Sequence, residues 1–121
     1  IAHPIDYMNK VRKALEIEGP KVIHVLAPCV RGWRYSPSDT IKLARLAVET
    51  RYFPIYEVEN GRVKITIKVD KPKPLEEFLK PQRRFAHLLK PENAHILEAL
   101  KKNVEENWER LVKLEESGVI I

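Results

Sequence analysis

Apolar and polar positions alternate with a helical period at both ends of the chain. Near the start, the apolar residues lie on one helical face, and charged residues occupy the other. These apolar residues are Ile5, Met8, Val11, Ala14 and Leu15. Pro4 suits a first helical turn and Gly19-Pro20 suits a stop, so the pattern predicts a helix over 4–18.

The end of the chain has a second and longer stripe. It consists of Ile96, Leu97, Leu100, Val104, Trp108, Leu111 and Leu114. Pro91-Glu92 suits the start of a helix and Ser117-Gly118 its end. This pattern predicts one long helix with a single apolar face.

Between the two helices, residues 22–27 form a continuous apolar run rich in β-branched residues, and Pro28 ends it. Such a run predicts a strand that is covered on both faces. His24 lies inside it, and we interpret it as a core histidine satisfied by a neighbour rather than as a catalytic group.

A helix start follows at Ser36-Pro37-Ser38-Asp39, where Ser36 can cap and Pro37 suits the first position. The apolar pattern beyond it predicts a helix to residue 50 or 51. The succession of helix, buried strand, loop and helix is typical of a layered α/β unit.

Residues 52–58 and 62–69 are predicted to pair as an antiparallel hairpin at a sheet edge, because Asn60-Gly61 between them favours a tight turn. Leu75, Phe78 and Leu79 indicate a short helix. Residues 82–90 are expected to cross the surface as an ordered arm.

The chain has 121 residues, of which 44% are hydrophobic and 32% charged, so one globular α/β domain is expected. The net charge of +5 is compatible with nucleic acid, coenzyme A or an acidic electron carrier as a partner. Nucleic acid is disfavoured because the basic residues are spread along the sequence without interleaved aromatic residues.

Several features concern the cellular setting. A single cysteine fits a reducing cytoplasm, and no apolar run has membrane-spanning length. The abundance of Lys, Glu, Arg and Pro, with one Gln and one Met, is typical of a thermophile protein. The first residue is Ile1 rather than Met, which indicates a fragment, a processed product or a trimmed chain.

The candidate chemistry centres on Cys29, because the sequence has no Gly-rich phosphate loop, HExxH or CxxC motif. Two interpretations of Cys29 stay open, a small buried hydrophobe and a metal-cluster ligand. Its position after the strand and next to Pro28 favours ligation, since a rigid loop suits a cluster. One thiolate cannot hold a cluster alone.

The neighbours of Cys29 also have alternative interpretations. Trp33 and Tyr35 could shield such a cluster from water, or simply pack under the loop. Arg31 and Arg34 could meet anionic groups, or be ordinary surface residues.

The chain resembles the carboxyl-terminal part of the β subunit of archaeal 2-oxoacid:ferredoxin oxidoreductases, the pyruvate and 2-oxoisovalerate enzymes. The matching segments run in order along nearly the whole sequence: MNKVRKALEIEGP, IHVLAPC, GWRYSPSDTIKLARLAVET, FPIYEVENGRVKITIK, PLEEFLKPQRRFAHL and ENWERLVKLEE. Their order and continuity make the resemblance specific.

The resemblance implies the end of a thiamine diphosphate-binding α/β fold, with a buried strand flanked by helices, an edge hairpin and a long last helix. It implies an enzyme that oxidatively decarboxylates a 2-oxoacid to an acyl-CoA and passes electrons through 4Fe–4S clusters to ferredoxin. Residues 1–121 would be one unit of a larger β subunit, with α, γ and δ subunits as partners. Cys29 would be the fourth cluster ligand, and the other three cysteines and the thiamine–magnesium motif would lie upstream.

Three departures from the family pattern concern this region. Val30-Arg31 follows the cysteine where the family has a small pair, and Arg31 there would favour the reduced cluster or contact substrate or a partner. Ser36 replaces an aspartate as an equivalent cap. Arg51 replaces a glycine that suits a left-handed helix end, at a cost of about 1 kcal/mol.

We also expect Trp33, Tyr35 and the terminal stripe to be buried against other chains, and the isolated segment to lack turnover. Two other functions stay open: a free-standing basic module for nucleic acid or an acidic protein, and a structural remnant whose cysteine carries no cluster.

Overall fold

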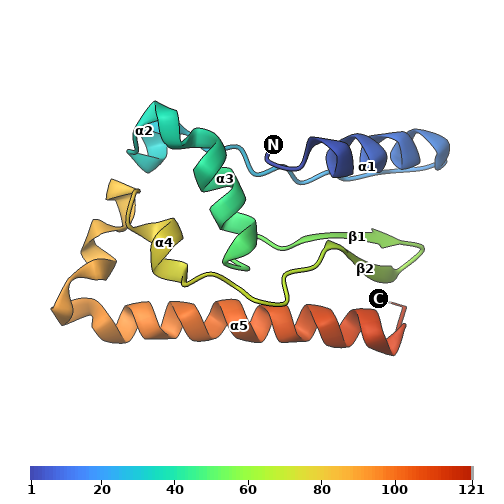
Figure 1. The fold of residues 1–121 in the computed structure, drawn as a ribbon. Coiled ribbons are helices and arrows are strands. Elements are labelled where there is room, and N and C mark those ends of the chain that lie inside the picture. The colour runs from blue at the N-terminus through green and yellow to red at the C-terminus, as the bar shows by residue number, and fades with distance from the viewer. Residues whose placement is uncertain (121) are drawn as a thin grey trace.

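The computed structural model describes residues 1–120, which form helices around one β-hairpin (Figure 1). The elements are α1 (Pro4–Glu16), α2 (Val30–Trp33), η1 (Pro37–Asp39), α3 (Thr40–Glu49), β1 (Ile55–Glu59), β2 (Arg62–Ile67), α4 (Leu75–Leu79), η2 (Arg83–Leu89), η3 (Pro91–Asn93) and α5 (Ala94–Ser117). The hairpin lies between α1 and α5, while α2, α3, α4 and η2 gather at the other end (Figure 1). The protein is therefore mixed helix and strand, consistent with the expected α/β class.

The structure confirms the hairpin predicted from Asn60-Gly61. Strands β1 and β2 pair antiparallel, with Val58 opposite Val63, and both turn residues have positive φ, 51° at Asn60 and 75° at Gly61. Val63 and Ile65 face inward and pack against Trp108 and Leu111 of α5. The buried face of β2 thus places the hairpin on the last helix.

The apolar stripe of α5 forms part of two separate hydrophobic clusters. Leu97, Leu100 and Val104 of α5 pack on the first cluster. The buried residues of this cluster are Trp33, Tyr35, Leu43, Leu46, Ala47, Leu75, Phe78 and Leu79. Trp108 and Leu111 belong to the second, with Val63 and Ile65. The helix ends as predicted at Gly118, whose φ is 60°.

Among residues 1–120 there is no helix with the length and apolar character needed to cross a bilayer.

Residues 22–27 do not form the predicted buried strand. They are extended without strand pairing, and Val22, Ile23 and Val25 are exposed to 94%, 41% and 47%. His24 is likewise exposed, with its ring edge on Phe53 at a centroid distance of 5.4 Å, so it is not a core histidine. The physical reason is that an extended run becomes a strand only when a neighbour pairs with its backbone, and the described residues supply none.

The helix predicted from Ser36 is divided. A 3₁₀ turn, η1, precedes α3, and the Ser36 hydroxyl contacts the Ser38 hydroxyl at 2.9 Å instead of capping a backbone N–H. The Thr40 hydroxyl donates to the Pro37 carbonyl at 2.7 Å. Side-chain pairs within the loop therefore replace the expected cap.

The predicted arm is ordered as η2, which is tied to α2 by a hydrogen bond from the Arg83 N–H to the Arg34 carbonyl, 3.0 Å. Gln82, just before it, is fully buried, and its amide donates to the Phe78 carbonyl at 2.5 Å. Segment 82–90 is thus ordered at the surface as predicted, and its Phe85 packs on the first cluster.

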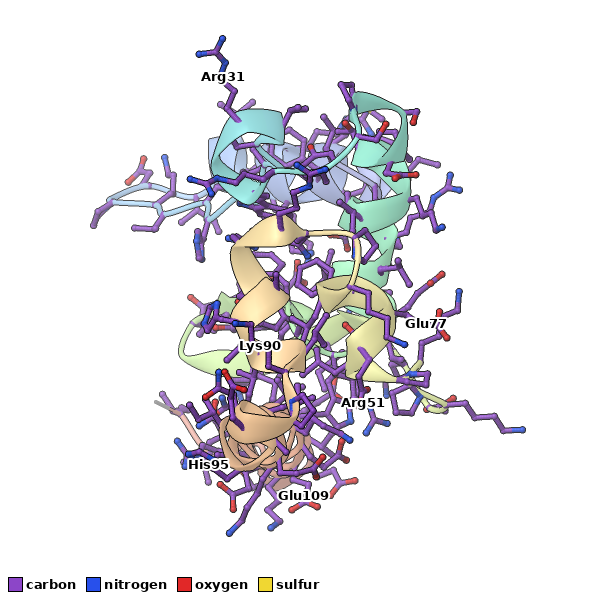
Figure 2. All side chains as sticks on the ribbon, turned by 90° about the vertical axis from the view of Figure 1, so that its left-hand side faces the viewer. Arg31, Arg51, Glu77, Lys90, His95 and Glu109 are labelled. Carbon is purple, nitrogen blue, oxygen red and sulfur yellow. The ribbon has the colours of Figure 1, made fainter. Side chains whose placement is uncertain are left out.

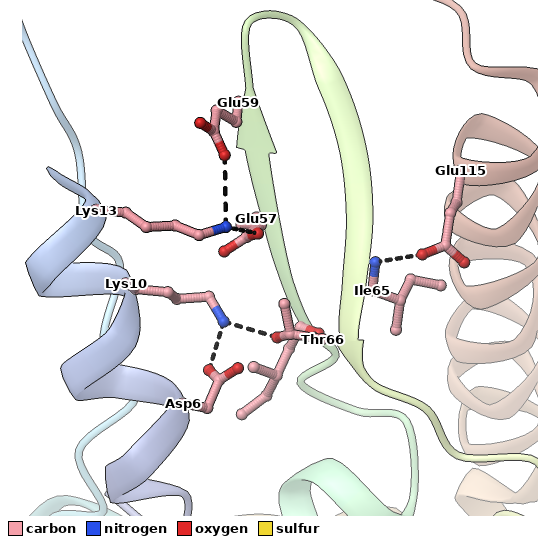
Figure 3. A network of polar contacts seen from close by, with 9 residues as sticks. Asp6, Lys10, Lys13, Glu57, Glu59, Ile65, Thr66 and Glu115 are labelled. Carbon is pink, nitrogen blue, oxygen red and sulfur yellow. Dashed lines mark hydrogen bonds and ion pairs between the residues drawn. The ribbon is translucent and has the colours of Figure 1, made fainter. Parts of the chain in front are cut away.

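Helix α1 is attached mainly by polar contacts (Figure 3). It ends at Glu16, two residues before the predicted end, and none of its residues is buried. Lys10 pairs with Asp6 and donates to the Thr66 hydroxyl at 2.7 Å, while Lys13 lies 2.6 Å from Glu57. On the opposite side of the hairpin, Glu115 of α5 accepts from the Ile65 N–H at 2.7 Å.

Arg51 follows α3 in the left-handed conformation, with φ of 60°, as the comparison with a family glycine predicted. Its guanidinium donates to the Val69 carbonyl at 2.6 and 3.0 Å, pairs with Glu105 at 2.8 Å and lies 4.6 Å from the Trp108 ring centroid. These contacts join α3, the end of the hairpin and α5. They offset the backbone strain of a residue with a Cβ.

Replacing Arg51 separates these two effects. Arg51→Ala keeps the strain and loses the contacts, so we expect the free energy of unfolding to fall by about 2–3 kcal/mol. Arg51→Gly loses the same contacts but removes the strain, so it should be about 1 kcal/mol more stable than Arg51→Ala. Urea unfolding measures both, with Lys102→Ala as an exposed control on α5. Equal stability of the alanine and glycine variants would contradict the strain.

The attachment of α1 should depend on pH through Asp6. Burial raises the pKa of Asp6, but hydrogen bonds from Lys10 and Thr66 and the charge of Lys10 outweigh it, so the pKa lies below its ordinary value of 3.8. A carboxyl group with a lowered folded-state pKa stabilises the fold above its ordinary pKa, and this contribution is lost as pH falls through the lowered value.

We therefore expect Asp6→Asn to weaken protection of the α1 amides near pH 7, and the difference from wild type to vanish near pH 2. Hydrogen exchange, corrected for its intrinsic pH dependence, measures this. Asp70→Asn is the matched control, because Asp70 is exposed. A difference that persists unchanged at low pH would contradict the ion pair.

Candidate functional site

Cys29 lies at the start of a short helical turn beyond the extended segment. It is the N-cap of α2, and its carbonyl accepts from the Trp33 N–H at 2.8 Å. Its side chain is exposed. The thiol is therefore not the buried hydrophobe that one interpretation proposed.

The sulfur of Cys29 receives a backbone donor. The Gly32 N–H points at Sγ, with an N–S distance of 3.3 Å. A Cβ on residue 32 would lie 3.4 Å from the same sulfur, so glycine keeps this side of the thiol open. An N–H donor suits a sulfur that carries negative charge, as a metal-bound thiolate does.

Within residues 1–120, no group of three or more His, Cys, Asp and Glu side chains is placed to bind a metal. His3 precedes α1, His87 lies in η2 and His95 in α5. Cys29 can thus supply one ligand, and a cluster at this position needs further ligands from outside the described chain.

Trp33 and Tyr35 are buried, with exposures of 9% and 8%. Trp33 meets Phe78 edge to face, with ring centroids 6.0 Å apart and planes at 87°, and lies 6.2 Å from Tyr35. These two residues pack within this chain, as do Trp108 and Leu111 of the terminal stripe. Trp33, Tyr35, Trp108 and Leu111 are therefore buried within this chain rather than against other chains. Ile96 of the stripe is 43% exposed, so burial of the rest of the stripe against other chains stays a prediction.

Arginine side chains lie around α2. Arg31 is exposed, and Arg34 ends the helix in the left-handed conformation with φ of 57°. A groove of about 540 Å³ lies beside it, lined by Arg34, Tyr35, Ser36, Asp39, Pro81 and Arg83. The loop after Cys29 therefore presents positive charge to solvent.

Arg84 is a site residue that the sequence analysis missed. Its guanidinium carbon lies 4.1 Å from the Trp33 ring centroid and 4.4 Å from that of Phe85. Its Nε donates to Oε1 of the buried Gln82 at 2.8 Å. Burial lowers the pKa of Arg84, which still remains charged at neutral pH. The only sequence signal was an arginine next to an aromatic residue.

A second concave region is formed by residues other than those around Cys29. It has about 480 Å³ and is lined by His3, Val48, Glu49, Ile67, Lys68, Val69, Asp70, Lys71 and Lys73. Glu49 and Lys73 pair across it at 2.8 Å. The His3 Nε2 atom is buried without a hydrogen-bond partner among the described residues.

Replacing Arg84 should destabilise the packing of residues 29–35, which we call the cysteine loop. Arg84→Met removes two cation–π contacts and leaves the Gln82 carbonyl oxygen without its donor, so the free energy of unfolding should fall by about 1–2 kcal/mol. Arg83→Met is the matched control, because Arg83 is exposed and its tie to Arg34 uses only the backbone. Equal stability of the two variants would contradict the role of the stack.

Comparisons with known proteins give consistent matches. The chain is 50% identical over 111 residues to pyruvate synthase subunit PorB of Methanocaldococcus jannaschii, which covers 92% of this chain and 36% of that subunit. It is 46% identical over 117 residues to the PorB subunit of Thermotoga maritima, covering 96% and 36%. It is 49% identical over 118 residues to ketoisovalerate oxidoreductase subunit VorB of Pyrococcus abyssi, covering 96% and 37%. No family model matches the chain. The chain thus spans about a third of the length of these relatives.

Proposed function

Because this chain belongs to the family of PorB and VorB, the β subunits of 2-oxoacid:ferredoxin oxidoreductases, we propose that it is the carboxyl-terminal part of such a subunit. In this role it contributes one thiolate, from Cys29, to a 4Fe–4S cluster of the enzyme. The complete enzyme oxidises a 2-oxoacid to an acyl-CoA and transfers the electrons to ferredoxin.

The observation that carries the proposal is the presentation of Cys29. Its sulfur is exposed at the start of a helical turn and accepts a backbone N–H. Pro28 before it and the packed Trp33 after it restrict the loop. A fixed, open thiol with one donor matches what a cluster needs from a single ligand.

The other cofactor-binding groups belong to the rest of the subunit in this proposal. Three further thiolates, and the residues that hold thiamine diphosphate and magnesium, lie upstream of the matching region in the family that the sequence resembles. The cluster supplies one-electron transfer when bound. The residues described here hold its fourth sulfur ligand and position it. The isolated chain is therefore expected to have no turnover.

The extended segment 22–27 supports the assignment to a larger unit. Its side chains Val22, Ile23 and Val25 are exposed, Leu26 packs against the first cluster, and its backbone takes part in no strand. Several apolar side chains of α1 are also exposed, such as Ile5 to 69% and Leu15 to 79%. In the intact subunit we expect residues 22–27 to pair with strands from the remaining two-thirds and to become the buried strand that their composition predicts.

The test of the proposal is the iron content of the intact complex, purified without oxygen. Cys29→Ala removes the fourth ligand, so we expect each β subunit to lose about four iron atoms and the matching cluster signal in electron paramagnetic resonance. Cys29→Ser allows for replacement of sulfur by oxygen and should shift that signal. Ser38→Ala, in the neighbouring loop, is the control.

Unchanged iron content and spectra in both cysteine variants would exclude the ligand. That result would favour a structural remnant whose cysteine carries no cluster. Assembly of the variants with the other subunits, measured by size exclusion, separates loss of the cluster from loss of folding.

A further inference from the structure

The positive charge of the chain is concentrated in two segments. Residues 19–48 carry five Lys and Arg and one acidic residue, and residues 80–90 carry four Lys and Arg and no acidic residue. These segments together have a net charge of +8, whereas the whole chain has +5, so the remainder is acidic on balance. The excess positive charge is therefore not spread evenly along the chain, as expected from the sequence, but lies in these two segments.

The fold places η2 beside α2 at one end of the molecule (Figure 1). The Arg83 N–H donates to the Arg34 carbonyl at 3.0 Å, and the Arg84 guanidinium stacks on Trp33 of α2. Arg34 and Arg83 also line one groove. We call the surface formed by Arg31, Arg34, Arg83 and Arg84 the arginine face. Arg31 and Arg34 belong to the helical turn that Cys29 begins, and Arg83 and Arg84 contact it.

The charge of the arginine face is not neutralised within the part of the chain that the structure describes. No carboxylate there lies within 4.0 Å of any of the four guanidinium groups, whereas Lys10, Lys13 and Arg51 are each paired. Arg31 projects away from the rest of the protein (Figure 2). Asp39 is the one acidic residue that lines the shared groove.

Arg84 is held in a way that suits recognition of an anion. Trp33 and Phe85 each lie within cation–π distance of its guanidinium, and the buried Gln82 fixes its Nε. The two terminal nitrogens donate to no partner in residues 1–120. A guanidinium whose orientation is already fixed loses little entropy when it binds a carboxylate with two parallel hydrogen bonds.

We propose that the arginine face is the docking surface for an acidic protein that approaches the enzyme next to Cys29. That this partner is an electron carrier depends on the proposed function, whereas the acidic nature of its surface does not. A protein is favoured over nucleic acid because Trp33 is buried and Arg84 covers its ring, so this ring is not available to stack on a base. Positive charge of this density steers an acidic partner and fixes its orientation.

The test uses the intact complex and the acidic ferredoxin of the same organism as the probe. Arg31→Glu and Arg83→Glu change exposed side chains that make no tertiary contact through their guanidinium groups among the described residues, so the fold should survive. The dissociation constant for ferredoxin should rise about tenfold at low ionic strength, and the difference should shrink in about 0.5 M salt. Lys102→Glu and Lys113→Glu, the same charge change on α5, should alter it less than about twofold.

Equal effects of the arginine and lysine variants, or no effect of either, would overturn the proposal. Tight binding of single-stranded RNA that is lost in Arg31→Glu and Arg83→Glu would also overturn it and identify a nucleic-acid site. Ferredoxin binding is also measured with Cys29→Ser. If that variant lacks the cluster change expected above but the arginine variants still weaken binding, the proposed function fails while the docking surface stands.

Discussion

The structure depends on the apolar stripe of α5, because the two hydrophobic clusters have no other long element in common. Leu97, Leu100 and Val104 cover the cluster beneath the cysteine loop, and Trp108 and Leu111 cover the inner face of the hairpin. Arg51 reinforces the junction, since it reaches Glu105 and the Trp108 ring from the end of α3. The position of the candidate site relative to the hairpin is thus set by burial along a single helix.

The same logic explains why the cysteine loop is ordered although the segment before it is not paired. Trp33 is buried against Phe78, Arg84 covers the Trp33 ring, and the backbone of Arg83 is tied to Arg34. These contacts come from residues 33–34 and 78–85, which follow Cys29 in the sequence. The geometry of the thiol therefore depends on the first cluster and not on pairing of residues 22–27.

Local signals predicted most of the elements. Asn60-Gly61 fixed the hairpin because both positions need positive φ, and the spacing from Leu97 to Leu111 fixed α5 because its period is helical. The prediction of a buried strand at 22–27 is wrong for the described residues, where Val22, Ile23 and Val25 are exposed, because an apolar pattern cannot supply the neighbouring strands that burial needs. Arg84 could not be found from sequence, since its stack on Trp33 joins residues 51 positions apart through tertiary packing.

One consequence concerns how the segment joins a larger subunit. Its unpaired surfaces, residues 22–27 and the apolar side of α1, precede Cys29 in the sequence, while the residues of the arginine face follow it. Apolar surfaces gain free energy by complete burial, whereas charged surfaces favour reversible contact that salt can weaken. The helical turn of Cys29 thus lies at a boundary between a surface suited to permanent association and one suited to exchange. A thiolate at such a boundary would be held from the permanent side and approached by a charged partner from the other.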